Sequence, residues 1–296
     1  MYPLQKNNSL AYIMSPQLGD SLIDMVLVNH IVSQGYNCTV YSNVLSVLND
    51  WFPKIHIKHY PTTDIKKSMM KYDVLLHTYP HNDLCNEASW HPHSYYLENI
   101  PYYQQESNLV DIVMKIASLF TGEPAERSNG ITPPENLNLN FRKNKNRIII
   151  HPTGSHPQKY WHARYAIKLA IKLRENGFDP VFITSESEVN ETKWIEEHDF
   201  QRFVDPSLSK VASFIYESEA FIGSDSGLAH LASALKIPTV TLHPRRKNKI
   251  RWHPGFSRNI ALLPSVNLIY RPLKDKYWKY LITEKSILKA FYQIVS

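Results

Sequence analysis

The residues best placed to do chemistry lie between Glu219 and Pro244, where a strand, a turn, a helix and a second strand follow one another. The turn Gly223-Ser224-Asp225-Ser226-Gly227 consists of small residues, which leave backbone N–H groups uncovered at the positive end of the helix. That arrangement can hold a phosphate or diphosphate, and His230 lies one turn into the helix as a further donor. Asp225 and Ser226 are also common helix N-cap residues, so a purely structural role stays open.

A second small-residue loop, Thr153-Gly154-Ser155, follows the β-branched run from Ile148 to Ile150. Such a run predicts a buried strand of a parallel sheet, and the loop then emerges at the carboxyl end of the strand, where α/β folds bind ligands. Lys159, just before Trp161 and an amphipathic helix from about Ala163 to Asn176, can reach a phosphate from there. A solvated surface lysine is the structural alternative.

Acidic residues follow two other predicted strands. Asp20 comes after a short apolar strand and opens a helix predicted from Ser21 to Gln34. Glu188, with Glu186 as the alternative, comes after the strand from Pro180 to Thr184. Each position is also typical of an acid that complements the helix dipole in a first turn.

Taken in order, these motifs resemble glycosyltransferase family 9, the ADP-heptose:lipopolysaccharide heptosyltransferases. The resemblance rests on Gly19-Asp20, on the small-residue loop with Lys159-Tyr160-Trp161, on the glutamate after the next strand, and on Asp225-Ser226-Gly227 with His230. It spans roughly residues 11–244, and the mutual spacing of the motifs is more specific than any one of them.

The resemblance implies an α/β fold of the GT-B type, with two Rossmann-like doubly wound parallel-sheet domains facing a central cleft. It implies inverting transfer of a heptose, or a similar sugar, from an ADP-sugar to a hydroxyl of a lipopolysaccharide core or other glycan acceptor. Asp20 is then the general base, and Lys159 stabilises the departing diphosphate. The residues it implies for the donor are Thr153, Gly154, Ser155, Glu188 for the nucleoside, Asp225, Ser226, Gly227 and His230.

The chain also departs from the family pattern. Leu242-His243-Pro244-Arg245-Arg246 replaces the usual loop after the final strand, and His77 to Asn82 is unusual local sequence. Two alternatives therefore stay open: a related GT-B transferase with a different nucleotide sugar, and a catalytically silent nucleotide-binding scaffold protein.

The predicted domain organisation follows from a segment rich in Pro, Asn and Gly that carries no periodicity. We expect an acceptor-binding domain over residues 1–130, a linker over 131–146, and a nucleotide-sugar-binding domain over 147–270. Residues 271–296 are expected to form a C-terminal helix that packs back on the first domain.

The composition favours anionic partners, since the formal net charge is +6 and the isoelectric point is near 9.0. The densest basic clusters are Arg142 to Arg147 and Arg245 to Lys249. Neither is interleaved with a nucleic-acid-binding motif, so we expect an anionic glycolipid, or peripheral contact with the inner leaflet of the membrane, rather than nucleic acid. A solvated linker surface is the alternative for the first cluster. Two cysteines and no long apolar run predict a cytoplasmic protein.

The chain has 14 histidines, and His77, His81, His91 and His93 lie close together in the sequence. Their spacing matches no closed zinc site. We expect no metal and no cofactor, because helix N-termini and basic side chains can stabilise a diphosphate without a metal ion.

Overall fold

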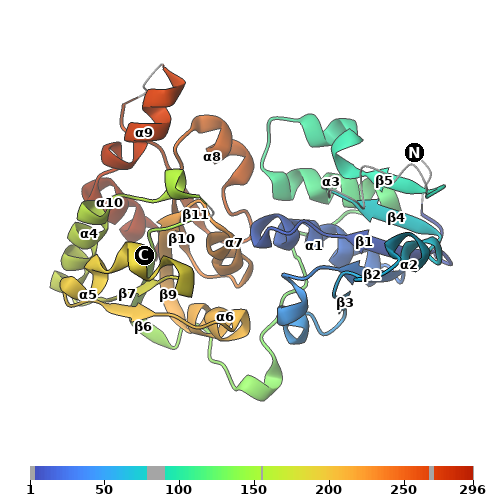
Figure 1. Cartoon of the computed structure of the whole chain (residues 1–296), viewed down its shortest axis with the longest axis horizontal. Coiled ribbons are helices and arrows are strands. Elements are labelled where there is room, and N and C mark those ends of the chain that lie inside the picture. Colours follow the sequence, from blue (N-terminus) through green and yellow to red (C-terminus); the bar gives the residue numbers. More distant parts are fainter. Residues whose placement is uncertain (1–3, 79–90, 155, 267–269, 296) are drawn as a thin grey trace. The chain divides into compact units, whose positions relative to one another are not determined.

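The computed structural model describes residues 4–78, 91–154, 156–266 and 270–295. The chain divides into two compact units, Met1–Pro134 and Glu135–Ser296 (Figure 1). The division falls inside the range 131–146 that the sequence analysis assigns to a linker. The end of that range is not linker, however, because Asn144 already begins the first strand of the second unit.

The first unit is built on a parallel sheet of five strands in the order β3-β2-β1-β4-β5. This is the Rossmann order, which reverses between β1 and β4. Its strands are β1 (Ser9–Ile13), β2 (Asn37–Tyr41), β3 (His56–Lys58), β4 (Val74–His77) and β5 (Ser94–Tyr96). Its helices are α1 (Leu18–Ser33), α2 (Ile65–Met70) and α3 (Leu109–Thr121), with short 3₁₀ helices η1 (Ser46–Trp51), η3 (Leu97–Asn99) and η4 (Pro101–Gln104). Strand β5 and the 3₁₀ form of η1 were not predicted from the sequence.

Helix α1 begins earlier than the sequence suggests, at Leu18 rather than Ser21. Gln17 precedes it in an extended conformation without a side-chain cap. Asp20 therefore lies inside the first turn, where an acid is stabilised by the helix dipole. The helix is buried on almost every side from Ser21 to Val28, which explains why its sequence is apolar all round rather than amphipathic.

The second unit carries a six-stranded parallel sheet in the order β11-β10-β9-β6-β7-β8. Read from β8, this is the complete Rossmann order, with its reversal between β6 and β9. Its strands are β6 (Asn144–His151), β7 (Asp179–Ile183), β8 (Gln201–Phe203), β9 (Ser218–Ser224), β10 (Thr239–Leu242) and β11 (Asn259–Leu262). Its helices are α4 (Ala163–Glu175), α5 (Trp194–Glu197), α6 (Leu208–Tyr216), α7 (Gly227–Ala234), α8 (Arg246–Trp252), α9 (Arg271–Leu281) and α10 (Glu284–Val295), with 3₁₀ helices that include η6 (Pro157–Lys159) and η7 (Glu186–Glu188).

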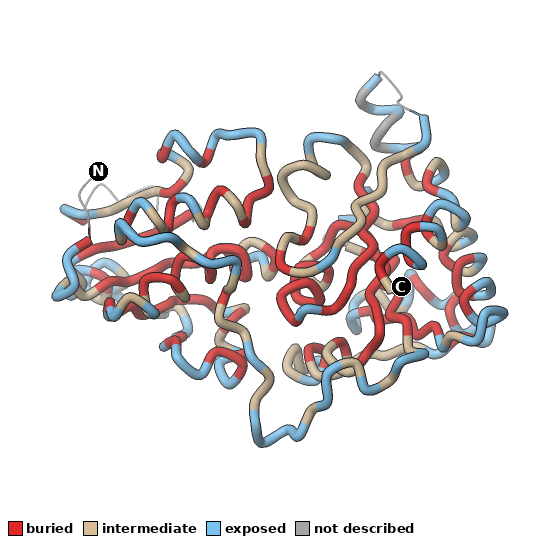
Figure 2. The backbone as a smooth tube through the Cα atoms, turned by 180° about the vertical axis from the view of Figure 1, so that it is seen from behind, coloured by how far each residue is buried: buried red, intermediate tan, exposed pale blue. Residues whose placement is uncertain are grey.

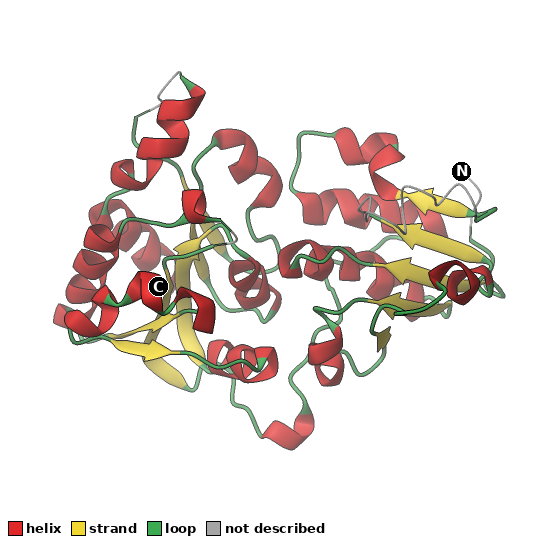
Figure 3. Cartoon of the chain, viewed as in Figure 1, coloured by secondary structure: helices red, strands yellow, loops and turns green. Residues whose placement is uncertain are grey.

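Helices flank both sheets, as the α/β alternation in the sequence predicts (Figure 3). In the second unit, α4 and α10 lie on one side of the sheet and α7 on the other (Figure 1). Buried backbone follows the strands of each unit, while loops and outer helices carry the exposed residues (Figure 2). Each unit thus has its own core, and the strand ends of each sheet are free to carry functional loops.

The C-terminal segment corrects one prediction. It forms two helices, α9 and α10, separated at Ile282 and Thr283, instead of one. Both belong to the second unit: Trp278 of α9 and Phe291 of α10 lie in the same hydrophobic core as Phe182. Helix α10 packs on α4 and on β9, β10 and β11, so this segment is part of the core of the second unit, and its packing on the first domain stays a prediction.

Candidate active site

The loops that follow β6 and β9 meet where the strand order of the second sheet reverses. His151, the last residue of β6, pairs with Gly223 in β9. Open parallel sheets bind ligands in the crevice at the carboxyl ends of the strands beside such a reversal. Most of the donor-binding residues expected from the sequence lie in these two loops.

Two glycines let the backbone segments approach closely. A Cβ atom on Gly223 would lie 2.6 Å from the backbone oxygen of His151. A Cβ atom on Gly154 would lie 3.0 Å from the Cβ of Lys159 and 3.5 Å from the backbone oxygen of Asp225. A larger residue at either position would push the loops apart, so the glycines hold the two loops together.

Lys159 and Asp225 form an ion pair between the two loops. The Lys159 Nζ lies 3.1 Å from Asp225 Oδ2 and donates to the backbone oxygen of Asp225 at 3.3 Å. The Asp225 side chain is 8% exposed and that of Lys159 is 31% exposed. A buried carboxylate needs its partner, so Asp225 fixes the position of an ammonium group that solvent, and hence a ligand, can reach.

Helix α7 begins beside this ion pair. Ser226 is its N-cap, in an extended conformation, and its hydroxyl accepts a hydrogen bond from the backbone N–H of Ala229 at 3.4 Å. Gly227 is the first helical residue. Ser226 therefore has the capping role that the sequence analysis left open, and the first turn still directs the positive end of the helix dipole toward the Lys159 loop.

Three histidines, His151, His230 and His243, lie buried at this edge of the sheet. Burial lowers the pKa of His230 and of His243 to about 4, and it also lowers the pKa of His151. Among the described residues, the Nδ1 atoms of His230 and His243 have no hydrogen-bond partner. All three imidazoles are therefore neutral at physiological pH.

The sequence analysis included only His230 of these three. His151 ends β6, and His243 directly follows β10, where its Nε2 lies 3.0 Å from Thr241 Oγ1. Their shared position directly at the carboxyl ends of strands is the sequence signal by which they could have been found. His243 had been treated only as a departure from the family pattern.

Thr153 and Glu188, both expected to bind the donor, make contacts within the protein. Thr153 is 1% exposed, and its Oγ1 lies 3.4 Å from His151 Nδ1. Glu188 Oε2 accepts a hydrogen bond from the backbone N–H of Ser185 at 2.7 Å and so completes a capping box on η7. Ser155, the remaining donor-binding candidate, lies outside the described residues.

Asp20 lies in the first unit, at the carboxyl end of β1, beside the reversal of that sheet. The Ser15 hydroxyl donates to Asp20 Oδ2 at 3.2 Å, and the Ser15 backbone oxygen accepts a hydrogen bond from the Ser21 hydroxyl at 2.7 Å. Asp20 is half-buried. Its place in the first sheet corresponds to that of the Lys159 loop in the second, because each follows the first strand of its unit.

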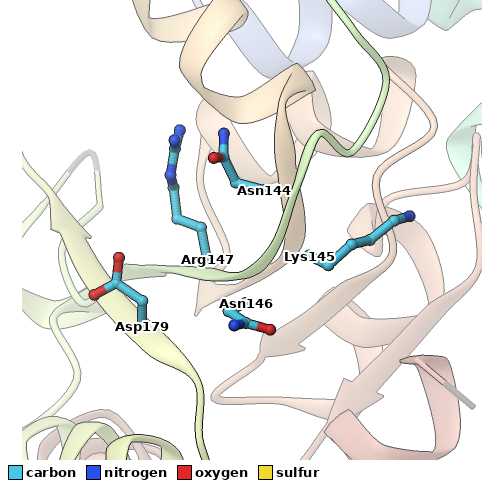
Figure 4. A pocket seen from close by; sticks show the side chains of 5 residues that line it. All are labelled: Asn144, Lys145, Asn146, Arg147 and Asp179. Atoms are coloured by element: carbon cyan, nitrogen blue, oxygen red, sulfur yellow. The ribbon is translucent and has the colours of Figure 1, made fainter.

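The first basic cluster has a structural role. Arg142 forms a bidentate ion pair with Glu219, and the Arg147 guanidinium lies 4.1 Å from the centre of the Phe214 ring. A shallow pocket is lined there by Asn144, Lys145, Asn146, Arg147 and Asp179 (Figure 4). It lies where β6 and β7 begin, at the edge opposite the Lys159 loop, and is therefore separate from the candidate site.

The second basic cluster lies at the functional edge. Arg246, Lys247 and Lys249 belong to α8, which begins four positions after the end of β10. Arg246 and Lys247 are exposed. This helix places positive charge at the same edge of the sheet as Lys159.

The histidines of the first unit serve other contacts. His77 Nε2 lies 3.0 Å from Ser94 Oγ, and His91 Nε2 lies 3.1 Å from the Tyr72 backbone oxygen. His81 and Cys85 lie outside the described residues. Within the described part of the chain, no three His, Cys, Asp or Glu side chains gather as a metal site would require. In that same part, no helix has the length and apolar character needed to cross a bilayer.

Comparison with solved structures places the fold. The chain is similar to a glycosyltransferase family 9 protein from Veillonella parvula, with a TM-score of 0.78 and 15% identity over 99% of both chains. It is similar to the E. coli ADP-heptose LPS heptosyltransferase II, with a TM-score of 0.71 and 16% identity over 97% of this chain and 98% of the other. E. coli heptosyltransferase WaaC, solved with ADP, gives a TM-score of 0.69 and 12% identity over 96% and 99%.

These similarities identify the GT-B fold, with its two parallel sheets and flanking helices. No curated protein sequence matches the chain at a significant level. The family model for glycosyltransferase family 9 (heptosyltransferase) matches residues 92–267, which is more than half of the chain and includes the Lys159 and Asp225 loops. The chain is a glycosyltransferase and belongs to glycosyltransferase family 9, the heptosyltransferase family.

Proposed function

We propose that this enzyme transfers a heptose, with inversion, from an ADP-heptose to a hydroxyl of a lipopolysaccharide core acceptor. The observation that carries the proposal is the Lys159–Asp225 ion pair beside the capped N-terminus of α7, 3.1 Å between Nζ and Oδ2. This arrangement offers an oriented ammonium group and free helix N–H groups to one anionic ligand. A diphosphate fits both, and it is also the leaving group of sugar transfer.

In this proposal Lys159 and the N-terminus of α7 stabilise the negative charge that develops on the departing diphosphate. Asp225 keeps the Lys159 ammonium oriented, and the neutral His230 adds no charge beside it. Gly154, Ser226 and Gly227 bring the backbone close to the ligand. Thr153 and His151 support the loop from beneath, and Glu188, beyond its capping bond, binds the ribose.

Asp20 acts in the proposal as the general base. A carboxylate near the acceptor hydroxyl removes its proton as the anomeric carbon gains positive charge, and displacement from the opposite side inverts that carbon. The Ser15 hydroxyl donates to Asp20 Oδ2 and so orients the carboxyl group. We place the acceptor on the first unit, which carries Asp20.

The choice of an ADP-sugar and of a lipopolysaccharide acceptor follows from similarity: one solved relative is described as an ADP-heptose LPS heptosyltransferase and another is solved with ADP. The exposed basic residues of α8 and the net charge of +6 suit an anionic glycolipid, and peripheral contact with the inner membrane by a cytoplasmic enzyme. We expect transfer without a metal ion or cofactor, and no nucleic-acid partner.

The first test is thermal stabilisation by ADP, UDP, GDP and CMP, each with and without magnesium, because a ligand of the folded state raises stability according to its affinity. We expect ADP alone to raise the Tm, to the same extent with and without magnesium. Transfer from ADP-heptose to truncated lipopolysaccharide is then followed by mass spectrometry, and the anomeric configuration by NMR. A preference for another nucleotide would overturn the ADP assignment. No stabilisation by any nucleotide would favour a silent scaffold instead.

A further inference from the structure

A buried polar network lies in the first unit where its strand order reverses. Tyr12 belongs to β1, and Thr78 directly follows β4, the two strands that flank the reversal. The Tyr12 hydroxyl and Thr78 Oγ1 are 2.6 Å apart and buried. The carboxyl group of Asp24, in the second turn of α1, lies beside both hydroxyls and interacts with them. The network therefore ties α1 to both strands.

Asp24 is an unusual residue for this place. It is 1% exposed, and among the described residues its Oδ2 has no hydrogen-bond partner. Burial raises the pKa of its carboxyl group well above the usual range, and the charges of Asp20 on α1 and Glu98 on η3 act in the same direction. Burial likewise raises the pKa of Tyr12, which Asp24 and Tyr103 of η4 reinforce. Asp24 is thus a neutral acid, able to donate a hydrogen bond to one of the hydroxyls.

We propose that Asp24 is a positioning residue for the transfer reaction: through Tyr12 and Thr78 it fixes the turn of α1 that carries Asp20. This rests on the role of Asp20 in the proposed function. Asp20 and Asp24 are separated by four residues, so they are neighbours on one face of the helix. A second carboxylate there would repel the charge of Asp20 and favour its protonated form. The neutral Asp24 adds no such charge beside Asp20.

The functional test compares Asp24→Asn, which keeps a neutral hydrogen-bonding group, with Asp24→Leu, which removes it. We expect Asp24→Leu to lower kcat for ADP release from ADP-heptose about tenfold, with KM for the donor and Kd for ADP unchanged. Asp24→Asn restores kcat, and Thr78→Val behaves as Asp24→Leu does. Met25→Leu, a buried apolar change in the same helix, is the matched control. A kcat of Asp24→Leu equal to that control, or no rescue by Asn, would overturn the proposal.

A second readout needs no turnover, so it separates failure of this proposal from failure of the proposed function. The ¹³C carboxyl resonance of Asp20, followed by NMR across pH, is expected to shift in Asp24→Leu and Thr78→Val and to return toward wild type in Asp24→Asn. An Asp20 resonance that is the same in all variants would overturn the positioning role. An enzyme that shows these shifts but releases no ADP would instead contradict the proposed function.

The protonation state of Asp24 is tested by linkage. The folded state holds a proton on Asp24 that the unfolded chain has lost above about pH 4. Unfolding near pH 7 therefore releases that proton, and the wild-type free energy of unfolding falls relative to that of Asp24→Asn as pH rises from about 4 toward the raised pKa. Parallel stability curves for the two proteins would show that Asp24 is ionised and would overturn its role as a neutral donor.

Discussion

Near the carboxyl ends of the strands, both units bury titratable side chains in their neutral form, an acid in the first unit and imidazoles in the second. In the first unit, burial raises the pKa of Asp24 and keeps a carboxyl group neutral. In the second, burial lowers the pKa of His230 and His243 and keeps two imidazoles neutral. The candidate functional groups lie nearer the surface: half-buried Asp20 in one unit, and partly exposed Lys159 with its partner Asp225 in the other.

The difference between the two edges suits different chemistry. The first edge presents a carboxylate, as expected for a group that accepts a proton from a hydroxyl. The second presents an ammonium group and a helix N-terminus, as expected for a group that binds a diphosphate. In both units, a neutral buried group thus lies close to the side chains that the proposed mechanism uses. The predictions below test that comparison, from the largest expected effect to the smallest.

Asp20→Asn is expected to have the largest effect. Loss of a general base should lower kcat about 10²–10⁴-fold, while the affinity for ADP stays within a few-fold of wild type because the proposed nucleotide site lies in the other unit. Steady-state kinetics and calorimetry with ADP measure the two quantities. Asp111→Asn is the matched control, since Asp111 also lies in the first turn of a helix of the first unit. Unimpaired transfer by Asp20→Asn would remove Asp20 from the mechanism.

Lys159→Gln should affect the other edge. Glutamine can still donate to Asp225 but carries no charge, so ADP affinity should fall about tenfold or more, and kcat by about 10²-fold if Lys159 stabilises the leaving group. Lys172→Gln is the control. Lys172 belongs to the same unit, lies exposed in the last turn of α4, and pairs with Glu175 at 2.7 Å. Equal ADP affinity in the Lys159 and Lys172 variants would contradict the proposed diphosphate site.

The neutral histidines predict how stability depends on pH. A histidine with a folded pKa of about 4, against an ordinary value of 6.5, binds its proton only in the unfolded state between these values. The free energy of unfolding should therefore fall as pH decreases from 6.5 toward 4. In His243→Gln this fall should be smaller by on the order of 2 kcal/mol, whereas exposed His56→Gln leaves it unchanged. Urea unfolding across this pH range measures the difference.

Much of the fold could be predicted because its signals are local. The β-branched run from Ile148 to Ile150 and the turn before Gly227 predict strand, loop and helix positions that the structure contains. The GT-B class followed from the order of these motifs. Strand β5 escaped prediction because Ser94–Tyr96 is short, only half-buried and held mainly by its pairing with β4. Such a strand depends on tertiary contact rather than on its own pattern.

The candidate sites were less predictable for the same reason. Lys159 and Asp225 could be singled out separately, but their ion pair depends on the meeting of loops that lie 66 residues apart. Asp24 escaped notice because α1 has no amphipathic pattern, and its neutrality follows from burial that only the tertiary structure provides. The core that the C-terminal segment joins could not be predicted, because a helical pattern shows which face is apolar, not which core that face meets.

That C-terminal segment contacts the Lys159 loop through one hydrogen bond, and its loss gives the smallest predicted effect. Trp278 of α9 is 1% exposed, and its Nε1 donates to the backbone oxygen of Gln158 at 2.9 Å, one residue before Lys159. Trp278→Phe keeps most of the packing but loses this bond, which is worth about 1 kcal/mol. The loop should then hold Lys159 less firmly, so we expect ADP to bind a few-fold more weakly. We expect little change in kcat at saturating donor. Trp194→Phe, a half-buried tryptophan packed edge-to-face on Phe182, is the control for lost aromatic area. If both variants weaken ADP binding equally, α9 contributes only packing. A selective effect of Trp278→Phe means that α9, through its hydrogen bond to Gln158, helps to orient Lys159.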